Sequence, residues 1–294
     1  MDRDTRLAAM HWLEQRIPAV VVEIADARGS APRGAGTRML VSAVQAIGTI
    51  GGGHLEFKAL ATAKAMLAAR DAGPRRERFP LGPALGQCCG GAVTLRFARL
   101  DARIAHDWPA TTPRFVLQLY GAGHVGRAIV RLLAGIPCEV QWIDERENEF
   151  PADVELPPHI ERVCVDPVEA EVDVAPAGAC YLVLTHRHDL DMRIAEAILR
   201  RGDFGFLGLI GSQTKRARFR NRYEQRGIPA ATLDRMTCPI GVPGIDGKEP
   251  DVIAVAVVAQ LLQLQLPAAA PTGAAQDVMN LHRAAPAHEP RYVL

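Results

Sequence analysis

The segment Tyr120-Gly121-Ala122-Gly123-His124-Val125-Gly126 decides the fold of the second half of the chain. It follows an apolar run, residues 115–120, that is typical of a buried strand, and it opens a helical apolar pattern over residues 124–134. Glycines spaced GxGxxG at such a junction let the backbone approach a pyrophosphate, which the N-terminus of the helix attracts. We therefore predict a ligand-binding turn made by Gly121, Gly123, His124 and Gly126.

The residues after this turn continue the pattern of alternating strands and helices. Asp144 ends the next apolar run, 18 residues after Gly126, where an acidic side chain would contact a ribose hydroxyl. Apolar runs separated by helical patterns predict a doubly wound parallel sheet with helices on both faces, a Rossmann-like domain over residues 114–266. An alternative is that the glycines serve only the packing of strand against helix, since a fold does not decide its ligand.

A second helix start follows the apolar run 204–210. Gly211 and Ser212 precede a basic helical segment that begins with Lys215 and Arg216. Ser212 is a typical N-cap, and the two cations in the first turn are placed to bind a phosphate. The alternative is a charged face that only contacts solvent. We predict that Gly211, Ser212, Lys215 and Arg216 take part in cofactor binding.

The first hundred residues predict a separate mixed α/β domain. A β-type run covers residues 19–25, a hairpin is expected at 39–41 with 46–50, and a long helix follows three glycines, Gly51–Gly53. Residues 101–113 are polar and rich in proline, which favours a linker. From residue 267 to 294 the Ala/Pro-rich composition predicts a flexible tail.

Two loops of this first domain carry unusual residues. Gln87, Cys88 and Cys89 precede two glycines, and adjacent cysteines are poorly spaced for a tetrahedral metal site. They suit an exposed loop whose thiol contacts a soft ligand or accepts sulfur, although a tight turn with half-buried cysteines is the alternative. The glycine run before His54, with arginines on the loop 28–37, favours a phosphorylated or pterin-like ligand.

Composition excludes several classes of protein. The formal net charge is +1, with 34 basic and 33 acidic side chains, so we expect no binding of nucleic acid or of an anionic membrane surface. Residues 1–18 do not have the pattern of a secretion signal, and no segment is apolar over 18 residues, so we expect a cytoplasmic protein without stable membrane insertion. Its six scattered cysteines are then mostly thiols.

Two enzyme classes compete for the same residues. The string Thr185-His186-Arg187-His188-Asp189-Leu190-Asp191 invites a metal-dependent hydrolase, but the pattern HxHxDH fails at Leu190 and Asp191. We interpret Asp191 as the cap of the following helix. An NAD(P)-dependent oxidoreductase would explain the glycine fingerprint, but no Tyr-x-x-x-Lys stretch supplies a proton donor. The residues therefore indicate the geometry of a cofactor site without evident catalytic chemistry.

Seven strings in order, across residues 5 to 265, closely resemble the XdhC/CoxI family of xanthine dehydrogenase accessory proteins. They are GSAPRGAGTRMLV, GTIGGGHLE, LGQCCGG, YGAGHVGRA, THRHDLD, LGLIGSQTKRARF and CPIGVPGIDGKEPDVIAVAVVAQLL. The resemblance implies an XdhC-type domain before the Rossmann-like domain and a chaperone that binds the molybdenum cofactor (molybdopterin). It further implies that the protein holds this cofactor while a cysteine desulfurase installs the sulfido ligand.

The resemblance also implies partners and leaves alternatives open. The cofactor would come from cofactor-supplying proteins and go to the molybdenum subunit of xanthine dehydrogenase, in purine catabolism. Cys88 and Cys89 would face the metal end, and the Rossmann crevice would hold the pterin phosphate or a nucleotide. Asp144 fits a dinucleotide better, so the cytosine-dinucleotide form and NAD(P) both stay open. A protein that holds a cofactor and docks on partners is often dimeric, so a homodimer is also expected.

Overall fold

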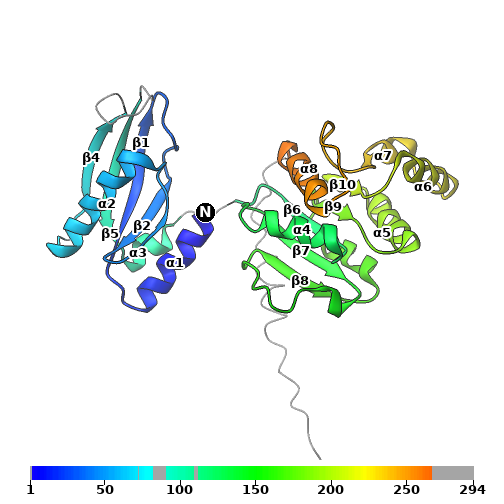
Figure 1. The fold of residues 1–294 in the computed structure, drawn as a ribbon, viewed down its shortest axis with the longest axis horizontal. Helices are drawn as coiled ribbons and strands as arrows, with labels where there is room; N and C mark the ends of the chain where they lie inside the picture. The colour runs from blue at the N-terminus through cyan, green and yellow to red at the C-terminus, as the bar shows by residue number, and fades with distance from the viewer. Residues whose placement is uncertain (1, 72, 82–90, 109–111, 267–294) are drawn as a thin grey trace, which may run out of the picture. The chain divides into compact units, whose positions relative to one another are not determined.

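The computed structural model describes residues 2–71, 73–81, 91–108 and 112–266. The chain divides into two compact units, residues 1–111 and 112–294 (Figure 1). Each unit has its own sheet and its own buried apolar clusters. The structure therefore confirms the predicted α/β class, with a parallel Rossmann-like sheet in the second half.

The first unit contains a five-stranded antiparallel sheet in the order β3-β2-β1-β5-β4. Its strands are β1 (Ala19–Arg28), β2 (Arg38–Ser42), β3 (Ala46–Gly48), β4 (Arg75–Pro80) and β5 (Ala92–Arg99). Along β1 the side chains of Val20 and Val22 pack on one face and those of Ala19 and Val21 on the other. Because successive side chains alternate between faces, both faces need a covering layer.

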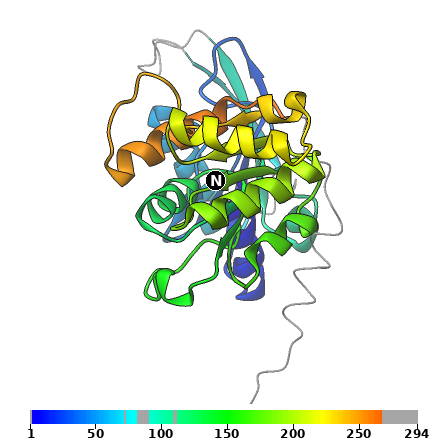
Figure 2. The same ribbon diagram turned by 90° about the vertical axis from the view of Figure 1, so that its right-hand side faces the viewer.

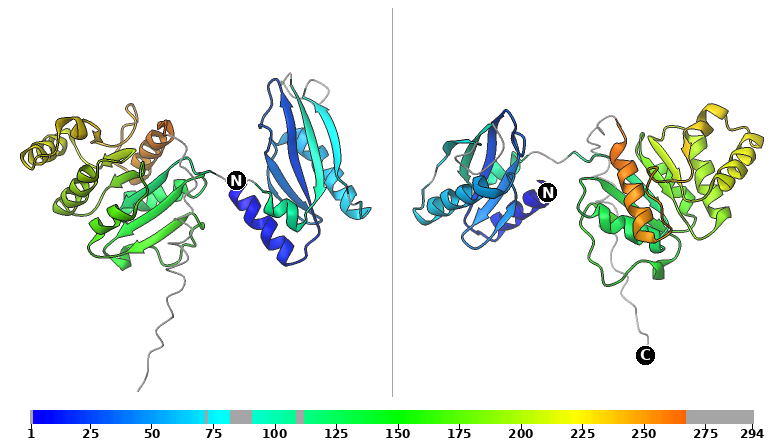
Figure 3. Two further views of the ribbon diagram at one scale, coloured as in Figure 1. Left: turned by 180° about the vertical axis from the view of Figure 1, so that it is seen from behind. Right: turned by 45° about the horizontal axis from the view of Figure 1, so that its top comes forward.

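Helices supply these two layers (Figure 3). The helix α2 (Gly53–Ala68) buries Leu55, Ala59, Ala63 and Met66 against one face. The helices α1 (Asp2–Glu14) and α3 (Ala102–His106) cover the other, with Trp12 and Trp108 in the same buried cluster. The segment 101–113, predicted to be a linker, thus begins with a packed helix whose N-cap Asp101 accepts the N–H of Ile104 at 2.7 Å.

The second unit contains a six-stranded sheet in which all neighbouring strands are parallel, in the order β11-β10-β9-β6-β7-β8. The strands are β6 (Val116–Tyr120), β7 (Glu139–Asp144), β8 (Ile160–Cys164), β9 (Cys180–Val183), β10 (Phe206–Leu209) and β11 (Met236–Thr237). Every residue of β9 and β10 is buried. Such continuous apolar strands are typical of a parallel sheet that helices cover on both sides.

The two helical layers of this unit are visible in Figures 1 and 2. On one face α4 (His124–Leu133) lies beside α8 (Pro250–Gln263), and both pack on Leu117, Leu119 and Leu182. On the other face lie α5 (His188–Arg201), α6 (Gln213–Gln225), α7 (Ala230–Asp234) and η3 (Val168–Val174). The 3-10 turn η2 (Glu147–Glu149) follows β7. None of the helices in the described ranges is long and apolar enough to cross a membrane.

The separate cores predict separate responses to a core mutation. Phe97 on β5 is fully buried in the first unit, so Phe97→Ala should lower the stability of that unit by about 3–5 kcal/mol. Native-state hydrogen exchange should show weaker protection of β1 and β5 and unchanged protection of β6 and β9. Val44→Ala, at a side chain that is 88% exposed, is the control and should change neither. An equal loss of protection in β6 and β9 would contradict two separate cores.

Candidate functional site

The predicted ligand turn lies where the order of the strands reverses. From β6 the chain proceeds through β7 and β8 on one side and through β9, β10 and β11 on the other. In open α/β sheets the crevice outside the carboxyl ends of the strands at this switch point is the usual ligand site. The turn after β6 sits between its neighbours, because Gly121 N–H donates to the Ile143 carbonyl of β7 and Leu184 N–H donates to the Tyr120 carbonyl.

The three glycines of the turn differ in what surrounds them. A Cβ at Gly121, whose φ is +120°, would lie 2.4 Å from the Leu184 carbonyl oxygen, and one at Gly126 would lie 2.1 Å from the Gly121 oxygen. These two glycines are therefore required by packing. A Cβ at Gly123 would meet nothing within 4 Å, and its φ is −69°. Protein packing does not explain Gly123, whose open side is free for a ligand.

The helix α4 begins directly at this open position. Gly123 is its N-cap and makes no side-chain cap, and His124, the first helical residue, is exposed. The first N–H groups of a helix lack partners inside the helix and carry partial positive charge, so an anion is stabilised there. The structure thus places Gly121, Gly123, His124 and Gly126 together at one turn.

Asp144 lies beside the turn, as expected, but its carboxylate is already engaged. Oδ2 accepts the N–H of Ala122 at 2.7 Å and Nη2 of Arg146 at 3.0 Å, while Oδ1 accepts the backbone N–H and Nε of Arg146, each at 3.0 Å. Burial alone would raise the pKa of Asp144, but the hydrogen bonds from Arg146 and Ala122 outweigh it and hold this pKa below its ordinary value. Only 5% of Asp144 is exposed.

Other charged groups line the same edge in pairs. Glu149 accepts Nη2 of Arg127 at 2.8 Å and Nη1 of Arg146 at 3.1 Å. Glu145 lies 3.4 Å from Nη2 of Arg187 and 3.7 Å from Nε2 of His186, which links the loops after β7 and β9. Arg146 was not among the predicted site residues, although an arginine two residues after the acidic end of a strand is a visible signal.

A buried ion pair joins the next two loops. Lys215 Nζ lies 2.6 Å from Asp191 Oδ2 and also donates to the Ile210 carbonyl at 2.7 Å. Asp191 Oδ1 accepts both the N–H and the hydroxyl of Thr185. The interpretation of Asp191 as a helix cap is wrong, because α5 begins at His188 with Arg187 as its N-cap. Lys215 faces Asp191, not an open phosphate position.

The start of α6 otherwise follows the predicted local structure. Ser212 is the N-cap, and its hydroxyl accepts the N–H of Lys215 at 3.3 Å. A Cβ at Gly211 would lie 2.5 Å from Cδ of Lys215, so this glycine makes room for the lysine side chain. Arg216, within the described part of the chain, has no ion-pair partner and is partly exposed.

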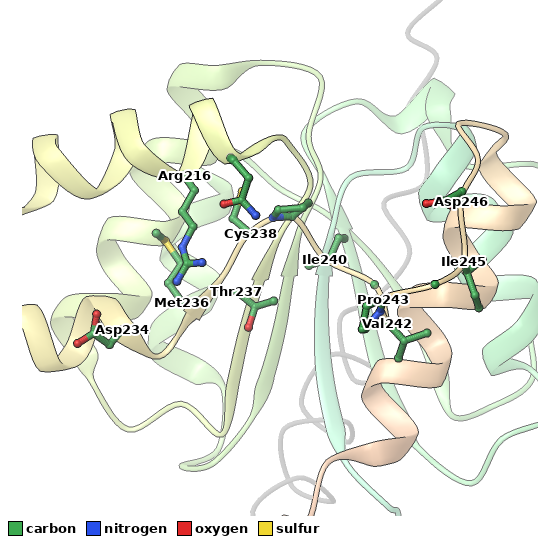
Figure 4. Close-up of a pocket in the computed structure, with 14 residues that line it drawn as sticks. Arg216, Asp234, Met236, Thr237, Cys238, Ile240, Val242, Pro243, Ile245 and Asp246 are labelled. Atoms are coloured by element: carbon green, nitrogen blue, oxygen red, sulfur yellow. The ribbon is translucent and has the colours of Figure 1, made fainter.

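Arg216 lines a pocket of about 410 Å³ at the carboxyl ends of β10 and β11 (Figure 4). The first turn of α6 and the segment 234–246 form its walls. Cys238 lies in the wall with its thiol 3.7 Å from the Ser212 carbonyl, and burial raises the pKa of this thiol, although Lys215 and Arg216 oppose the shift. A pocket of this size is in the range that holds a small molecule.

In the first unit, the glycine run before α2 is held by its own helix. The Glu56 carboxylate accepts the N–H groups of Ile50 and Gly52 and the hydroxyl of Thr49. These donors are therefore not free for an anion. A Cβ at Gly51 would lie 2.5 Å from Pro32, so the loop 28–37 packs directly on this run.

The two described residues that flank the predicted cysteine loop, Leu81 and Gly91, are hydrogen-bonded to each other. Leu81 N–H donates to the Gly91 carbonyl at 2.7 Å, and a Cβ at Gly91 would lie 2.4 Å from the Arg28 carbonyl oxygen. Gln87, Cys88 and Cys89 lie outside the described residues. The described residue Gly91 that follows them lies beside the loop 28–37.

The metal-hydrolase alternative gains no support from the described residues. His186 and His188 are exposed, and Asp191 is buried with Thr185 and Lys215. Across the described ranges, no group of three or more His, Cys, Asp or Glu side chains is arranged to hold a metal ion.

The geometry defines a class of protein: an α/β unit with a Rossmann-type ligand turn, linked in one chain to a second, antiparallel α/β unit. The model of the XdhC and CoxI family matches residues 12–80, and the model of the XdhC Rossmann domain matches residues 117–261. The chain belongs to the XdhC and CoxI family.

Two individual proteins show the same likeness. The uncharacterized protein YqeB of Escherichia coli (strain K12) is 27% identical over 256 residues, which cover 86% of this chain and 44% of that protein. The chain thus spans less than half the length of this relative. A crystal structure described as a xanthine dehydrogenase from Bacillus halodurans matches with a TM-score of 0.71 and 19% identity, over 91% of this chain and 98% of that one. At this identity the match shows a shared fold.

The glycine geometry predicts unequal costs of substitution. Gly126→Ala places a methyl group against the Gly121 carbonyl and should destabilise the second unit by about 3 kcal/mol or more. Gly123→Ala meets no neighbouring atom and should cost less than about 1 kcal/mol, mostly as a weaker N-cap. Urea denaturation of the two variants measures the difference. Equal costs would show that Gly123 too is required by packing.

The buried ion pair predicts a second difference. Lys215→Met leaves the Asp191 carboxylate buried and without its cation, so it should cost about 3–5 kcal/mol in a urea titration. The double variant Asp191→Asn with Lys215→Met should recover part of this loss. Arg218→Met, at an exposed position on the same helix, is the control with little change. Equal stability of Lys215→Met and the control would contradict the structural role of the pair.

Proposed function

We propose that this chain is an accessory protein that binds the molybdenum cofactor and delivers it, after sulfuration, to a xanthine dehydrogenase-type molybdoenzyme. The observation that carries the proposal is membership of the XdhC and CoxI family, whose models match segments in both units. This membership supports a role in maturation of such an enzyme and a molybdoenzyme as partner. Sulfuration by a cysteine desulfurase and transfer to the molybdenum subunit are the finer parts of the proposal.

The geometry of the second unit fits the phosphate end of such a cofactor. The open side of Gly123 and the first turn of α4 offer backbone donors and partial positive charge to an anion. When bound, the cofactor supplies the molybdenum centre on which the chemistry of the client enzyme depends. The residues of this chain would bind and orient it.

The first unit carries the thiols of the proposal, Cys88 and Cys89. Among the described residues that flank these cysteines, Leu81 N–H donates to the Gly91 carbonyl, and Gly91 lies against the loop 28–37 with Arg28 and Arg33. Thiolates are ligands for soft metals, and arginines pair with phosphate or carboxylate groups. This combination supports a role for these thiols as ligands of molybdenum.

An NAD(P)-dependent oxidoreductase is the second candidate. The glycine turn at the switch point of a parallel sheet favours it. It differs from the carrier in its bound ligand, because it would retain a nicotinamide dinucleotide and no molybdenum.

The decisive measurement is the ligand content of the protein purified without oxygen from a host that makes the cofactor. Mass spectrometry measures molybdenum, and fluorescence after oxidation measures the pterin. Near-stoichiometric amounts of both would support the carrier. Nicotinamide dinucleotide with neither molybdenum nor pterin would favour the oxidoreductase.

The cysteine loop predicts a specific loss in the same assay. Replacing both Cys88 and Cys89 with Ala should lower the molybdenum retained per chain by about tenfold, because the soft ligands are removed. The thermal unfolding midpoint should stay unchanged. Cys164→Ala, at an exposed free thiol of the second unit, is the matched control and should retain the wild-type content. Unchanged retention in the double variant would remove these thiols from the proposal.

A further inference from the structure

The ligands that suit the crevice fall into two chemical classes. NAD and the cytosine-dinucleotide form of the cofactor present a ribose with two free hydroxyls. NADP and the bare pterin cofactor instead present a phosphate monoester. A ribose diol is recognised by a carboxylate that accepts its hydroxyl hydrogens, whereas a phosphate monoester is recognised by arginine N–H donors. The residues at the end of β7 distinguish the two classes.

Asp144 has no acceptor left for a diol. A carboxylate has about four lone-pair positions, and Asp144 accepts four hydrogen bonds, one from Ala122 and three from Arg146. Its side chain is 3% exposed. Hydroxyl groups of a ribose would have to displace the Arg146 guanidinium before they reached either oxygen.

Arg146, in contrast, has donors to spare. Its guanidinium carries five N–H groups, of which Nε–H and one on Nη2 bind Asp144, and one on Nη1 binds Glu149. Two N–H groups, one on each terminal nitrogen, are then left, and 31% of the side chain is exposed. Each of these N–H groups can donate a hydrogen bond to a phosphate oxygen.

The carboxylates nearest to Arg146 are paired with arginines. Each of the carboxylates of Asp144, Glu145 and Glu149 lies within 4 Å of an arginine, namely Arg146, Arg187 and Arg127. Glu147 is exposed and makes no ion pair within the described residues, and Arg187 also contacts Asp189. A phosphate therefore meets mostly paired carboxylates and the unused donors of Arg146.

We propose that Arg146 makes the crevice select a ligand that ends in a phosphate monoester over one that ends in a free ribose diol. This inference rests on the crevice that the proposed function uses. It favours the monophosphate pterin and NADP over the cytosine-dinucleotide form and NAD. Asp144 then acts as the positioning residue that holds the guanidinium in place.

NADP⁺ and NAD⁺ form a matched pair of probes, because they differ only in the 2′-phosphate. Isothermal titration of the full chain should give a Kd for NADP⁺ about tenfold or more below that for NAD⁺. Arg146→Gln should remove this preference by weakening NADP⁺, and Arg146→Lys should keep part of it through its charge. Equal or tighter binding of NAD⁺ would overturn the inference, and so would no binding of either probe.

The controls separate selectivity from folding and from the proposed function. Arg131→Gln breaks an exposed ion pair with Asp251 in the same unit and should keep the full preference for NADP⁺. Thermal unfolding should show Arg146→Gln folded under the titration conditions. A preference for NAD⁺ in a protein that retains molybdenum would overturn this inference alone, whereas a preference for NADP⁺ without molybdenum would overturn only the carrier function.

Discussion

The close approach of backbone segments at the turn after β6 is the constraint on which the second unit depends. Gly121 lies against the Leu184 carbonyl and Gly126 against the Gly121 carbonyl, at distances that leave no room for a side chain. This approach sets where α4 starts, and α4 packs beside α8 over the apolar face of β6 and β9. In this arrangement the Ala122 N–H donates a hydrogen bond to the Asp144 carboxylate. Gly121 and Gly126 therefore determine both the packing of α4 and the geometry of the ligand turn.

Local pattern was enough to predict most of the fold. The strands β1, β6 and β9 are mostly apolar, and each has a glycine near one end, so the apolar runs and the turn residues indicate the same boundaries. The strand β4 was not predicted, because Arg75–Pro80 has four charged residues and no apolar alternation. Only Phe79 of this strand is buried. It is an edge strand, and charged side chains on an edge protect it from pairing with other chains. The helix α3 was not predicted because it has only five residues within a polar, proline-rich segment, although its N-cap Asp101 was a visible signal.

The site was predicted in position but not in its pairings. The spacing of Gly121, Gly123 and Asp144 indicated the turn and the strand end next to it. The partner of Lys215 was not predictable from its neighbours, because Asp191 is 24 residues away along the chain and reaches it only through adjacent strands. The engaged state of Asp144 likewise depends on the direction of the Arg146 side chain, which a single sequence does not specify. A charged residue at a strand end therefore indicates where a site lies, but not which residue it pairs with.

The paired charges explain how one sheet edge can bind an anion while it carries several carboxylates. Asp144, Glu149 and Asp191 are each neutralised by a basic side chain of the same unit. Groups of both signs stay unpaired among the described residues of this edge: spare donors of Arg146 beyond β7 and Arg216 beyond β10, and the carboxylates of Glu147 and Asp246. Between the two arginines lies the open turn at Gly123. Neighbouring strands are about 4.8 Å apart, so the edge from β7 to β11 spans about 19 Å. Donors at both ends of that span favour an extended ligand with more than one polar group over a single small anion.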